Sequence, residues 1–165
     1  MKIPSFQFLQ QITPTPIPVS SPSLDSMSHI WEHIAERFLG TALIDRIQTG
    51  RIRSLRLLAV HDAVSSIIDP GFGNIYQPSH LVRSTHAALA ATARTSHDIL
   101  AAFFNDPSDR EDLAHTLEEV LSLFGNEPEK KKGLAIGAES AEAYLSAFSG
   151  LIPAKTTFLL RHVAA

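Results

Sequence analysis

The segment HIWEH, at residues 29–33, is the one part of this sequence whose residue types and spacing could support chemistry by themselves. His29 and His33 stand one helical turn apart, so on a helix both imidazoles could bind the same zinc ion. Glu32 could then act as the general base for a zinc-bound water. The pattern therefore indicates a candidate zinc hydrolase site.

A zinc site of this kind needs a third protein ligand and an open position for water. A carboxylate on another helix, such as Glu111 or Glu118, is the type required, although the sequence does not bring either one to the histidines. Short motifs of this form often occur by chance. Trp31 lies between the two histidines and is typical of a core position. We expect Trp31 in the core, the histidines at its edge, and no bound metal.

The segment KKKGLAIGAESAEAYL, at residues 130–145, raises the question of whether its lysines and glycines bind phosphate. A phosphate loop places glycines before a helix and a Lys-Ser/Thr pair after them, so that backbone amides and the ammonium converge on the anion. Here the lysines precede the glycines. Gly133, Gly137 and Ala141 recur every four residues, which puts them on one side of a helix. We interpret them as a helix-packing face that another backbone approaches closely.

Three shorter patterns carry weaker signals. Residues 78–80, PSH, suggest the oxyanion-binding P-S-G-H motif of certain phosphatases, but the glycine is missing, and proline and serine are common in turns. His61-Asp62 and His97-Asp98 are adjacent pairs, and neighbouring side chains on a helix point roughly 100° apart. We therefore expect neither pair to form a dyad, and we predict no catalytic residue.

Length and composition indicate one soluble domain without disulfides. The chain has 165 residues, of which 44 % are hydrophobic and 19 % charged, and its net charge is −3. This charge argues against a nucleic-acid partner, which would need a basic excess on one face. The absence of cysteine excludes thiolate nucleophiles and cysteine-bound zinc. No stretch reaches the ~18 apolar residues of a membrane span, and no signal peptide is evident, so we expect a cytoplasmic protein.

Proline content and hydrophobic spacing divide the chain into three parts. Five of the ten prolines lie within residues 1–22, which we predict to be an extended Pro-rich arm. Residues 23–150 contain apolar residues at three- and four-residue spacing and no convincing strand alternation, which predicts an all-α bundle of five or six helices. Residues 151–165 are a C-terminal tail that could form a short helix or a strand.

The first two predicted helices meet at Gly50. Ser23 is a suitable N-cap for the first helix, whose apolar stripe runs from Leu24 through Ile47. The second helix, residues 51–69, has apolar residues on most of its circumference. A helix of that kind is expected to be central and covered on several sides.

Three further helices are expected after a loop rich in proline and glycine. Ser84 or Thr85 opens the first of them, which is unusually rich in alanine. Ser108 and Glu111 have the spacing of a capping box at the start of the next. Pro128 suits the first turn of the last.

Three segments follow one another in an order and approximate spacing that one known protein family also shows. They are RIRSLRLLAVHDAVSSI, THAALAATARTSHDILAAFF and GLAIGAESAEAYLSAFSG. With them, residues 51–150 resemble the N-terminal helical half of vanadium-dependent haloperoxidase-like proteins, relatives of the type 2 phosphatidic acid phosphatases. Trp31 suits the tryptophan often seen on the preceding helix of that family. The points of contact are Arg53, Ala59, Asp62 and Ala63, then Ala87, Ala88, Ala91, His97 and Leu100, then Gly133, Gly137, Ala141 and Gly150.

The resemblance implies a helical scaffold half without a catalytic site. In that family the oxyanion site, which holds vanadate or a phosphoryl group, comes from motifs of the C-terminal half, and residues 151–165 show none of them. The expected function is a non-catalytic assembly module with no cofactor. Its expected partner is a second copy of the chain or a separate helical catalytic subunit. The alternatives are one component of a split phosphatase or vanadium haloperoxidase, with catalytic residues supplied in trans, and a zinc hydrolase that uses HIWEH.

Overall fold

The computed structural model of this chain describes residues 21–41, 45–69, 75–78, 82–104, 106–125 and 127–151. Its helices, in chain order, are α2 (Leu24–Thr41), α3 (Arg46–Ile68), α4 (Thr85–Phe103), α5 (Pro107–Leu121) and α6 (Glu127–Ala147), followed by the 3-10 turn η1 (Ser149–Leu151). No strand occurs among these residues. The predicted all-α bundle is confirmed. Nearly all of the predicted arm and tail, residues 1–20 and 152–165, lies outside the described residues.

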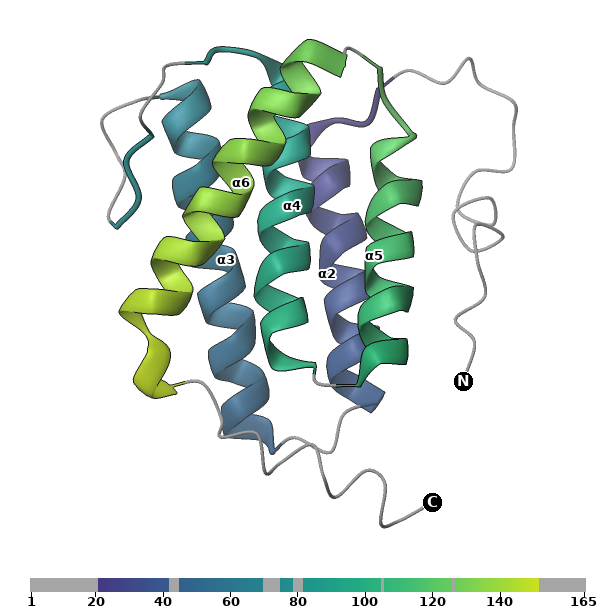
Figure 1. The fold of residues 1–165 in the computed structure, drawn as a ribbon, viewed down its shortest axis with the longest axis vertical. Coiled ribbons are helices and arrows are strands. Elements are labelled where there is room, and N and C mark those ends of the chain that lie inside the picture. The colour runs from purple at the N-terminus through teal and green to yellow at the C-terminus, as the bar shows by residue number, and fades with distance from the viewer. Residues whose placement is uncertain are drawn as a thin grey trace.

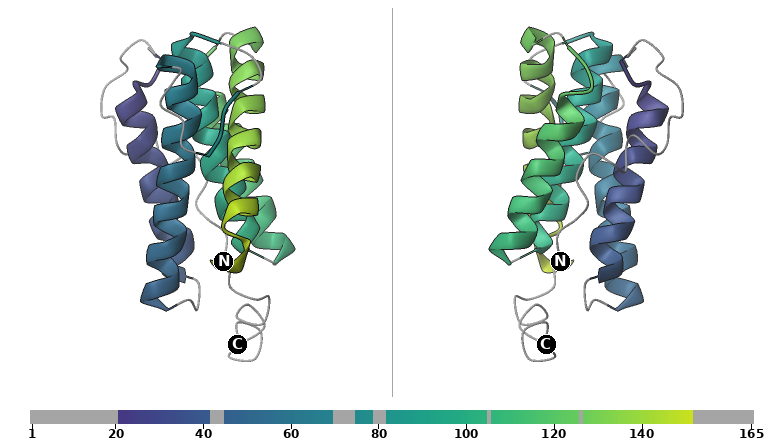
Figure 2. Two further views of the ribbon diagram at one scale, coloured as in Figure 1. Left: turned by 90° about the vertical axis from the view of Figure 1, so that its left-hand side faces the viewer. Right: turned by 90° about the vertical axis from the view of Figure 1, so that its right-hand side faces the viewer.

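The bundle is organised around α4. In Figure 1, α4 runs through the middle, with α3 on one side and α5 on the other, while α6 crosses in front of it. The side views in Figure 2 show α2 on the opposite side of α4 from α6. α4 therefore contacts each of the other four helices, and its most extensive contact is with α6.

The prediction that residues 51–69 form the central helix was wrong. These residues belong to α3, which packs on α4 and α6 but leaves its opposite side open, where Leu57 and Leu58 are about half exposed. The central place belongs to α4 because its inward side chains are small. Ala87, Ala88 and Ala91 are among its fully buried residues, and small side chains let neighbouring helices approach from several directions.

The predicted boundary between the first two helices was also wrong. α2 ends before residue 42, and α3 begins directly after Asp45. The carboxylate of Asp45 accepts a hydrogen bond from the Gln48 backbone N–H at 2.8 Å, which satisfies one of the open amide groups of the new helix. Ile47 and Gly50 therefore lie inside the first two turns of α3. The cap at Asp45 therefore starts a new helix within the predicted apolar stripe.

Two predicted N-caps are confirmed, and one is corrected. Ser23 Oγ accepts from Ser26 N at 3.1 Å, and Ser84 Oγ accepts from Ala87 N at 3.3 Å. The capping box at Ser108 and Glu111 does not start α5. Asp106 is the N-cap, its carboxylate accepts from Ser108 N at 2.9 Å, and Pro107 occupies the first helical position, where its fixed φ favours helix initiation.

A large core lies where α2, α3, α4, α5 and α6 meet. Trp31 and Leu100 are fully buried there, and the rings of Phe38 and Phe104 pack with their centroids 5.4 Å apart. A smaller cluster around Ile67 fills the space between α3, α4 and α6. Among the helices described, none combines the length and the apolar character needed to cross a membrane.

Candidate functional site

The HIWEH segment lies in α2 with its tryptophan in the core. Trp31 is fully buried, whereas His29 and His33 are exposed, which agrees with the expectation from the sequence. Glu32, the candidate general base, forms an ion pair with the guanidinium of Arg56 on α3. The carboxylate that the zinc hypothesis requires is therefore already held by a buried cation.

No third zinc ligand accompanies these histidines in the described structure. Among the residues that the structure describes, no three His, Cys, Asp or Glu side chains are grouped so that they could hold a metal ion. Glu111 and Glu118, the types of carboxylate that we considered, lie on α5 and are exposed. His33 lies 4.0 Å from Glu36 of its own helix. The zinc-hydrolase hypothesis has no geometric support in this part of the chain.

Arg56 is the buried partner of the half-buried Glu32. Its side chain is 2 % exposed, and Nη1 donates a hydrogen bond to Ser96 Oγ at 3.3 Å. Burial lowers the pKa of Arg56, and the attraction of the Glu32 carboxylate opposes this change. Removing the partner of a buried charge is strongly destabilising. Glu32 therefore neutralises Arg56 and holds α2 against α3.

The lysines at the start of residues 130–145 do not converge on an anion site. Lys130 Nζ lies 2.9 Å from Glu127 Oε1 and 5.1 Å from the centre of the Phe124 ring. Lys132 Nζ lies 2.9 Å from Glu129 Oε1. Both ammonium groups are paired with carboxylates one turn earlier in α6.

The glycines of the same segment lie against α4. A Cβ added at Gly133 would come within 2.8 Å of Ala87 Cα and closer still to the carbonyl group of that residue. At Gly137 an added Cβ would lie 2.8 Å from Ala91 O. Ala141, the third member of the stripe, is 1 % exposed. The stripe lets the backbones of α6 and α4 approach to contact distance, so its role is packing inside the bundle.

Asp62 is the centre of a buried polar network beneath α6. Its Oδ2 atom accepts hydrogen bonds from Ile75 N at 2.9 Å, Tyr76 N at 3.2 Å and Tyr144 Oη at 2.6 Å. Tyr76 Oη donates in turn to Glu139 Oε2 at 2.7 Å. Burial raises the pKa of each tyrosine, and the carboxylate beside each phenol adds to the effect. The network joins α3, α6 and the segment at residues 75–78.

The expectation that His97 and Asp98 would not pair as a dyad was wrong. His97 Nδ1 lies 2.7 Å from Asp98 Oδ1, and Arg94 Nε donates to both oxygens of the same carboxylate. Burial acts to raise the pKa of Asp98, but hydrogen bonds from His97 and Arg94 outweigh it and lower the pKa. A shallow hollow between α4 and α6 includes Asp98 and Ser146 but not His97. The imidazole and this hydroxyl therefore do not share a site.

Two remaining patterns do not form sites in the described residues. His61 is exposed, and its Nδ1 atom lies 3.9 Å from Asp62 Oδ1, too far for a hydrogen bond. Of the segment PSH, Pro78 is described, whereas residues 79 and 80 lie outside the described residues.

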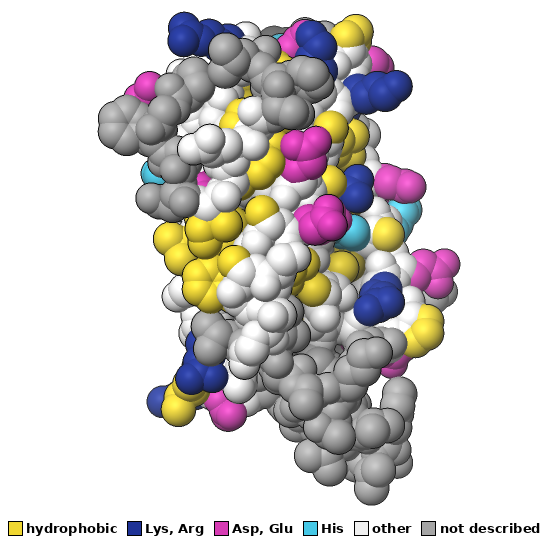
Figure 3. All heavy atoms as spheres, turned by 60° about the vertical axis from the view of Figure 1, so that its left-hand side comes forward, with side chains coloured by type: hydrophobic (Ala, Val, Ile, Leu, Met, Phe, Trp, Pro, Cys, Tyr) yellow, Lys and Arg dark blue, Asp and Glu magenta, His cyan; other side chains and the backbone are white. Residues whose placement is uncertain are grey.

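Large aliphatic side chains gather on the side of α3 that faces away from α4. Ile47 is 69 % exposed, Leu57 53 %, Leu58 47 % and Ile68 53 %. We call these four residues the outer face of α3. Figure 3, in which the α3 side of the bundle comes forward, shows hydrophobic side chains grouped on that side of the molecule. Four half-exposed aliphatic residues therefore form an exposed apolar surface on one helix.

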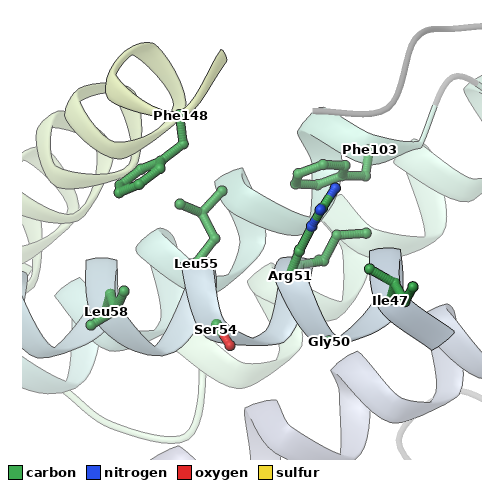
Figure 4. Close-up of a pocket in the computed structure, with 9 residues that line it drawn as sticks. Ile47, Gly50, Arg51, Ser54, Leu55, Leu58, Phe103 and Phe148 are labelled. Atoms are coloured by element: carbon green, nitrogen blue, oxygen red, sulfur yellow. The ribbon is translucent and has the colours of Figure 1, made fainter. Parts of the chain in front are cut away.

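A groove of about 380 Å³ borders the outer face of α3. Figure 4 shows Ile47 and Leu58 along α3, with Phe148, which follows α6, and Phe103 at the end of α4 opposite them. Most of its wall is apolar, so the groove extends the apolar surface beyond the helix itself. Its lining residues are Ile47, Gly50, Arg51, Ile52, Ser54, Leu55, Leu58, Phe103 and Phe148.

The sequence did not locate this surface, because the second helix was predicted to be central and covered on several sides. Ile47 was also assigned to the preceding helix. A signal was present. Ile47 and Leu58 are eleven residues apart, as are Leu57 and Ile68, and eleven residues make roughly three helical turns. Such a repeat, on a helix that also carries a complete inner apolar side, predicts a second apolar side.

No family model, curated protein or solved structure matches this chain. The resemblance of residues 51–150 to the haloperoxidase-like proteins therefore stays a prediction from the sequence, and the structural argument about function depends on the surfaces described above.

Proposed function

We propose that this chain is a non-catalytic helical assembly module that binds another protein surface through the outer face of α3. The observation that carries the proposal is the exposure of Ile47, Leu57, Leu58 and Ile68 on one helix. Removing such apolar surface from water favours association by roughly 25 cal/mol for each Å². A folded chain that keeps four large aliphatic side chains half in water gains from a partner that covers them.

The partners of three carboxylates support a non-catalytic role. Glu32 neutralises Arg56, Asp62 accepts three hydrogen bonds, and Asp98 is held by Arg94 and His97. A catalytic acid or base must reach a substrate. These carboxylates are instead engaged in joining helices or in local ion pairs.

The resemblance noted from the sequence is consistent with this proposal. In the haloperoxidase-like family the N-terminal helical half packs against the catalytic bundle and often helps form dimers. A related module would need one helix face that its own bundle leaves open. The outer face of α3 meets that requirement, whereas the Gly133 face of α6 is already covered by α4.

Light scattering combined with an apolar fluorescent dye tests the proposal. The wild-type chain is compared with a Leu57→Gln, Leu58→Gln double variant over a wide range of protein concentration. We expect the wild type either to gain mass with concentration or to bind the dye through the open face, and the double variant to lose both properties while keeping its helical circular dichroism.

An Ala114→Gln, Ala135→Gln double variant is the matched control, because both alanines are exposed on other helices. It should behave as the wild type. A wild-type chain of constant monomeric mass that does not bind the dye would overturn the proposal, and so would association or dye binding that survives the two leucine substitutions.

A further inference from the structure

The groove beside the outer face of α3 has a positive charge on an otherwise largely apolar wall. Among the described residues that line it, Arg51 is the sole ionisable residue and Ser54 the sole hydroxyl. The guanidinium of Arg51 keeps its charge, because arginine is not deprotonated in proteins. The chain as a whole has a net charge of −3, so an attraction for anions is a local property of this groove.

Four of the lining side chains form one row along α3. Their spacings of four, four and three residues place them on one side of the helix. They are Ile47, Arg51, Leu55 and Leu58. The charge therefore lies within the apolar row, and the row continues with aliphatic side chains for roughly 10 Å beyond Arg51.

Two phenylalanines form the opposite wall of the groove. Phe103 is the last residue of α4 and is buried. Phe148 directly follows α6, and its ring stacks on that of Tyr144 at a centroid distance of 6.0 Å. Figure 4 shows both rings across the groove from Leu55 and Arg51. Because the bundle itself holds both rings, the groove has its shape before any ligand binds.

The size and the lining of the groove suit a small molecule with an apolar chain and one anionic group. Its volume of about 380 Å³ falls in the range of roughly 300–1,000 Å³ that ligand sites occupy. A guanidinium can bind a carboxylate through two parallel hydrogen bonds. With the carboxylate at Arg51, a chain of about eight carbons reaches Leu58, since that distance along the helix is roughly 10 Å.

We propose that this groove binds a medium-chain carboxylate, with the carboxylate at Arg51 and the hydrocarbon chain along Leu55 and Leu58, opposite Phe148. This inference goes beyond the assembly role and does not depend on it. The groove shares Ile47 and Leu58 with the outer face of α3. A bound ligand therefore covers part of the surface that a protein partner would contact.

Isothermal titration calorimetry with decanoate and with decanol, its uncharged counterpart, tests the place of the carboxylate. We expect the wild-type chain to bind decanoate more tightly than decanol. Arg51→Gln should weaken decanoate binding about tenfold, because one charge-assisted contact is lost, and should leave decanol binding unchanged. Arg83→Gln is the matched control, since Arg83 is exposed just before α4 and the substitution removes the same charge. It should bind both molecules as the wild type does.

Two adjacent leucines test the apolar wall. Leu58 lines the groove, whereas Leu57 is exposed to a similar extent but does not line it. Leu58→Gln should weaken the binding of both decanoate and decanol about fivefold, because apolar contact with the chain is lost. Leu57→Gln should change neither. Both variants should keep the helical circular dichroism of the wild type, because both side chains are already about half exposed.

The length of the hydrocarbon chain gives a third measurement. The affinity of a carboxylate should rise about threefold with each added CH₂ group while the chain still gains contact with the groove. It should stop rising at about ten carbons, where the chain passes Leu58. Adsorption to an unbounded apolar surface would show no such limit.

The outcomes separate this inference from the assembly role. Equal binding of decanoate by the wild type and by Arg51→Gln would overturn the place of the carboxylate, and an affinity that keeps rising with chain length would overturn a bounded site. A chain that binds neither decanoate nor decanol would overturn the inference and leave the assembly role intact. A strictly monomeric chain that binds decanoate through Arg51 would support the inference and overturn only self-association.

Discussion

Two apolar helix faces of this bundle differ in what covers them. The inner face of α6 consists of small residues, among them Gly133, Gly137 and Ala141, and it lies against the alanines of α4. The outer face of α3 consists of large aliphatic residues, and nothing in the described structure covers Leu57 and Leu58 fully. Both faces are apolar, yet only the first is complete within one chain.

The difference shows how residue size distinguishes a helix face that packs inside the bundle from a helix face that stays exposed. A glycine stripe has almost no side-chain surface to bury, and mid-helix glycine costs roughly 1 kcal/mol relative to alanine. Close packing against a neighbouring backbone, which a larger side chain would prevent, offsets this cost. Leucine and isoleucine have much apolar surface to bury, so their exposure on one face of α3 is the basis of the proposed binding role.

The largest loss of stability is expected when a side chain is added inside the α4–α6 contact. Gly133→Val places methyl groups where the backbone of Ala87 already lies, so we expect a loss of at least about 3 kcal/mol in the free energy of unfolding. Denaturant unfolding followed by circular dichroism measures it. Gly40→Ala is the matched control, because an added Cβ there has no neighbour within 4 Å. That control should gain up to about 1 kcal/mol from helix propensity.

A second test removes the polar centre under α6. Asp62→Ala leaves the backbone amides of Ile75 and Tyr76 and the phenol of Tyr144 without their acceptor in a buried site, so we expect a loss of about 3 kcal/mol. Asp98→Ala removes a carboxylate at the surface of the bundle and should cost about 1 kcal/mol. Equal losses for the two variants, measured by thermal unfolding, would contradict the assigned roles.

The ionisation of the tyrosines tests whether water reaches the buried polar network, since Tyr76 and Tyr144 are the two tyrosines of the chain. Burial and neighbouring carboxylates raise the pKa of both above the ordinary value of 10.0. The unfolded chain therefore releases these protons at lower pH than the folded chain. Stability is fully retained below pH 10.0 and falls as the pH rises above it.

Absorbance of the phenolates checks this expectation. Their ionisation should lag behind that of free tyrosine until the chain unfolds, and Tyr144→Phe should reduce the alkaline loss of stability. Phenols that titrate normally in the folded chain would show that water reaches the network.

The smallest effect is expected on the outer face of α3. Leu57→Gln should change the free energy of unfolding of the dilute chain by no more than about 0.5 kcal/mol, because the side chain is already 53 % exposed. Denaturant unfolding at low protein concentration, with Leu55→Gln as the buried counterpart, makes the measurement. A loss as large as that of Leu55→Gln would mean that Leu57 belongs to the core.

Much of the bundle could be predicted from the sequence, because local rules decide it. Ser23 and Ser84 cap their helices as predicted, since a cap depends on a side chain and an amide only a few residues away. The same locality explains the errors. Asp45 and Asp106 are equally good caps, and the choice of Gly50 and Ser108 as boundaries ignored them.

The candidate sites were less predictable. The HIWEH pattern placed two histidines correctly on one helix, but Glu32 faces Arg56, which lies 24 residues later in the chain. The carboxylate of Asp98 contacts both His97 and Arg94, which lies one turn earlier. Partners of this kind depend on how side chains meet in space, and a motif of five residues does not contain that information.

The sequence by itself determined that residues 23–150 form a helical bundle, where α2 and α4 begin, and that Gly133 and Gly137 share one side of a helix. Those properties follow from backbone hydrogen bonding, capping and the 3.6-residue period. Only the tertiary structure decided that α4 is the central helix and that α3 keeps an open outer face. Burial depends on which helices cover which sides, and apolar residues on every side of α3 are compatible with a covered helix as well as with a helix that has one side left for a partner.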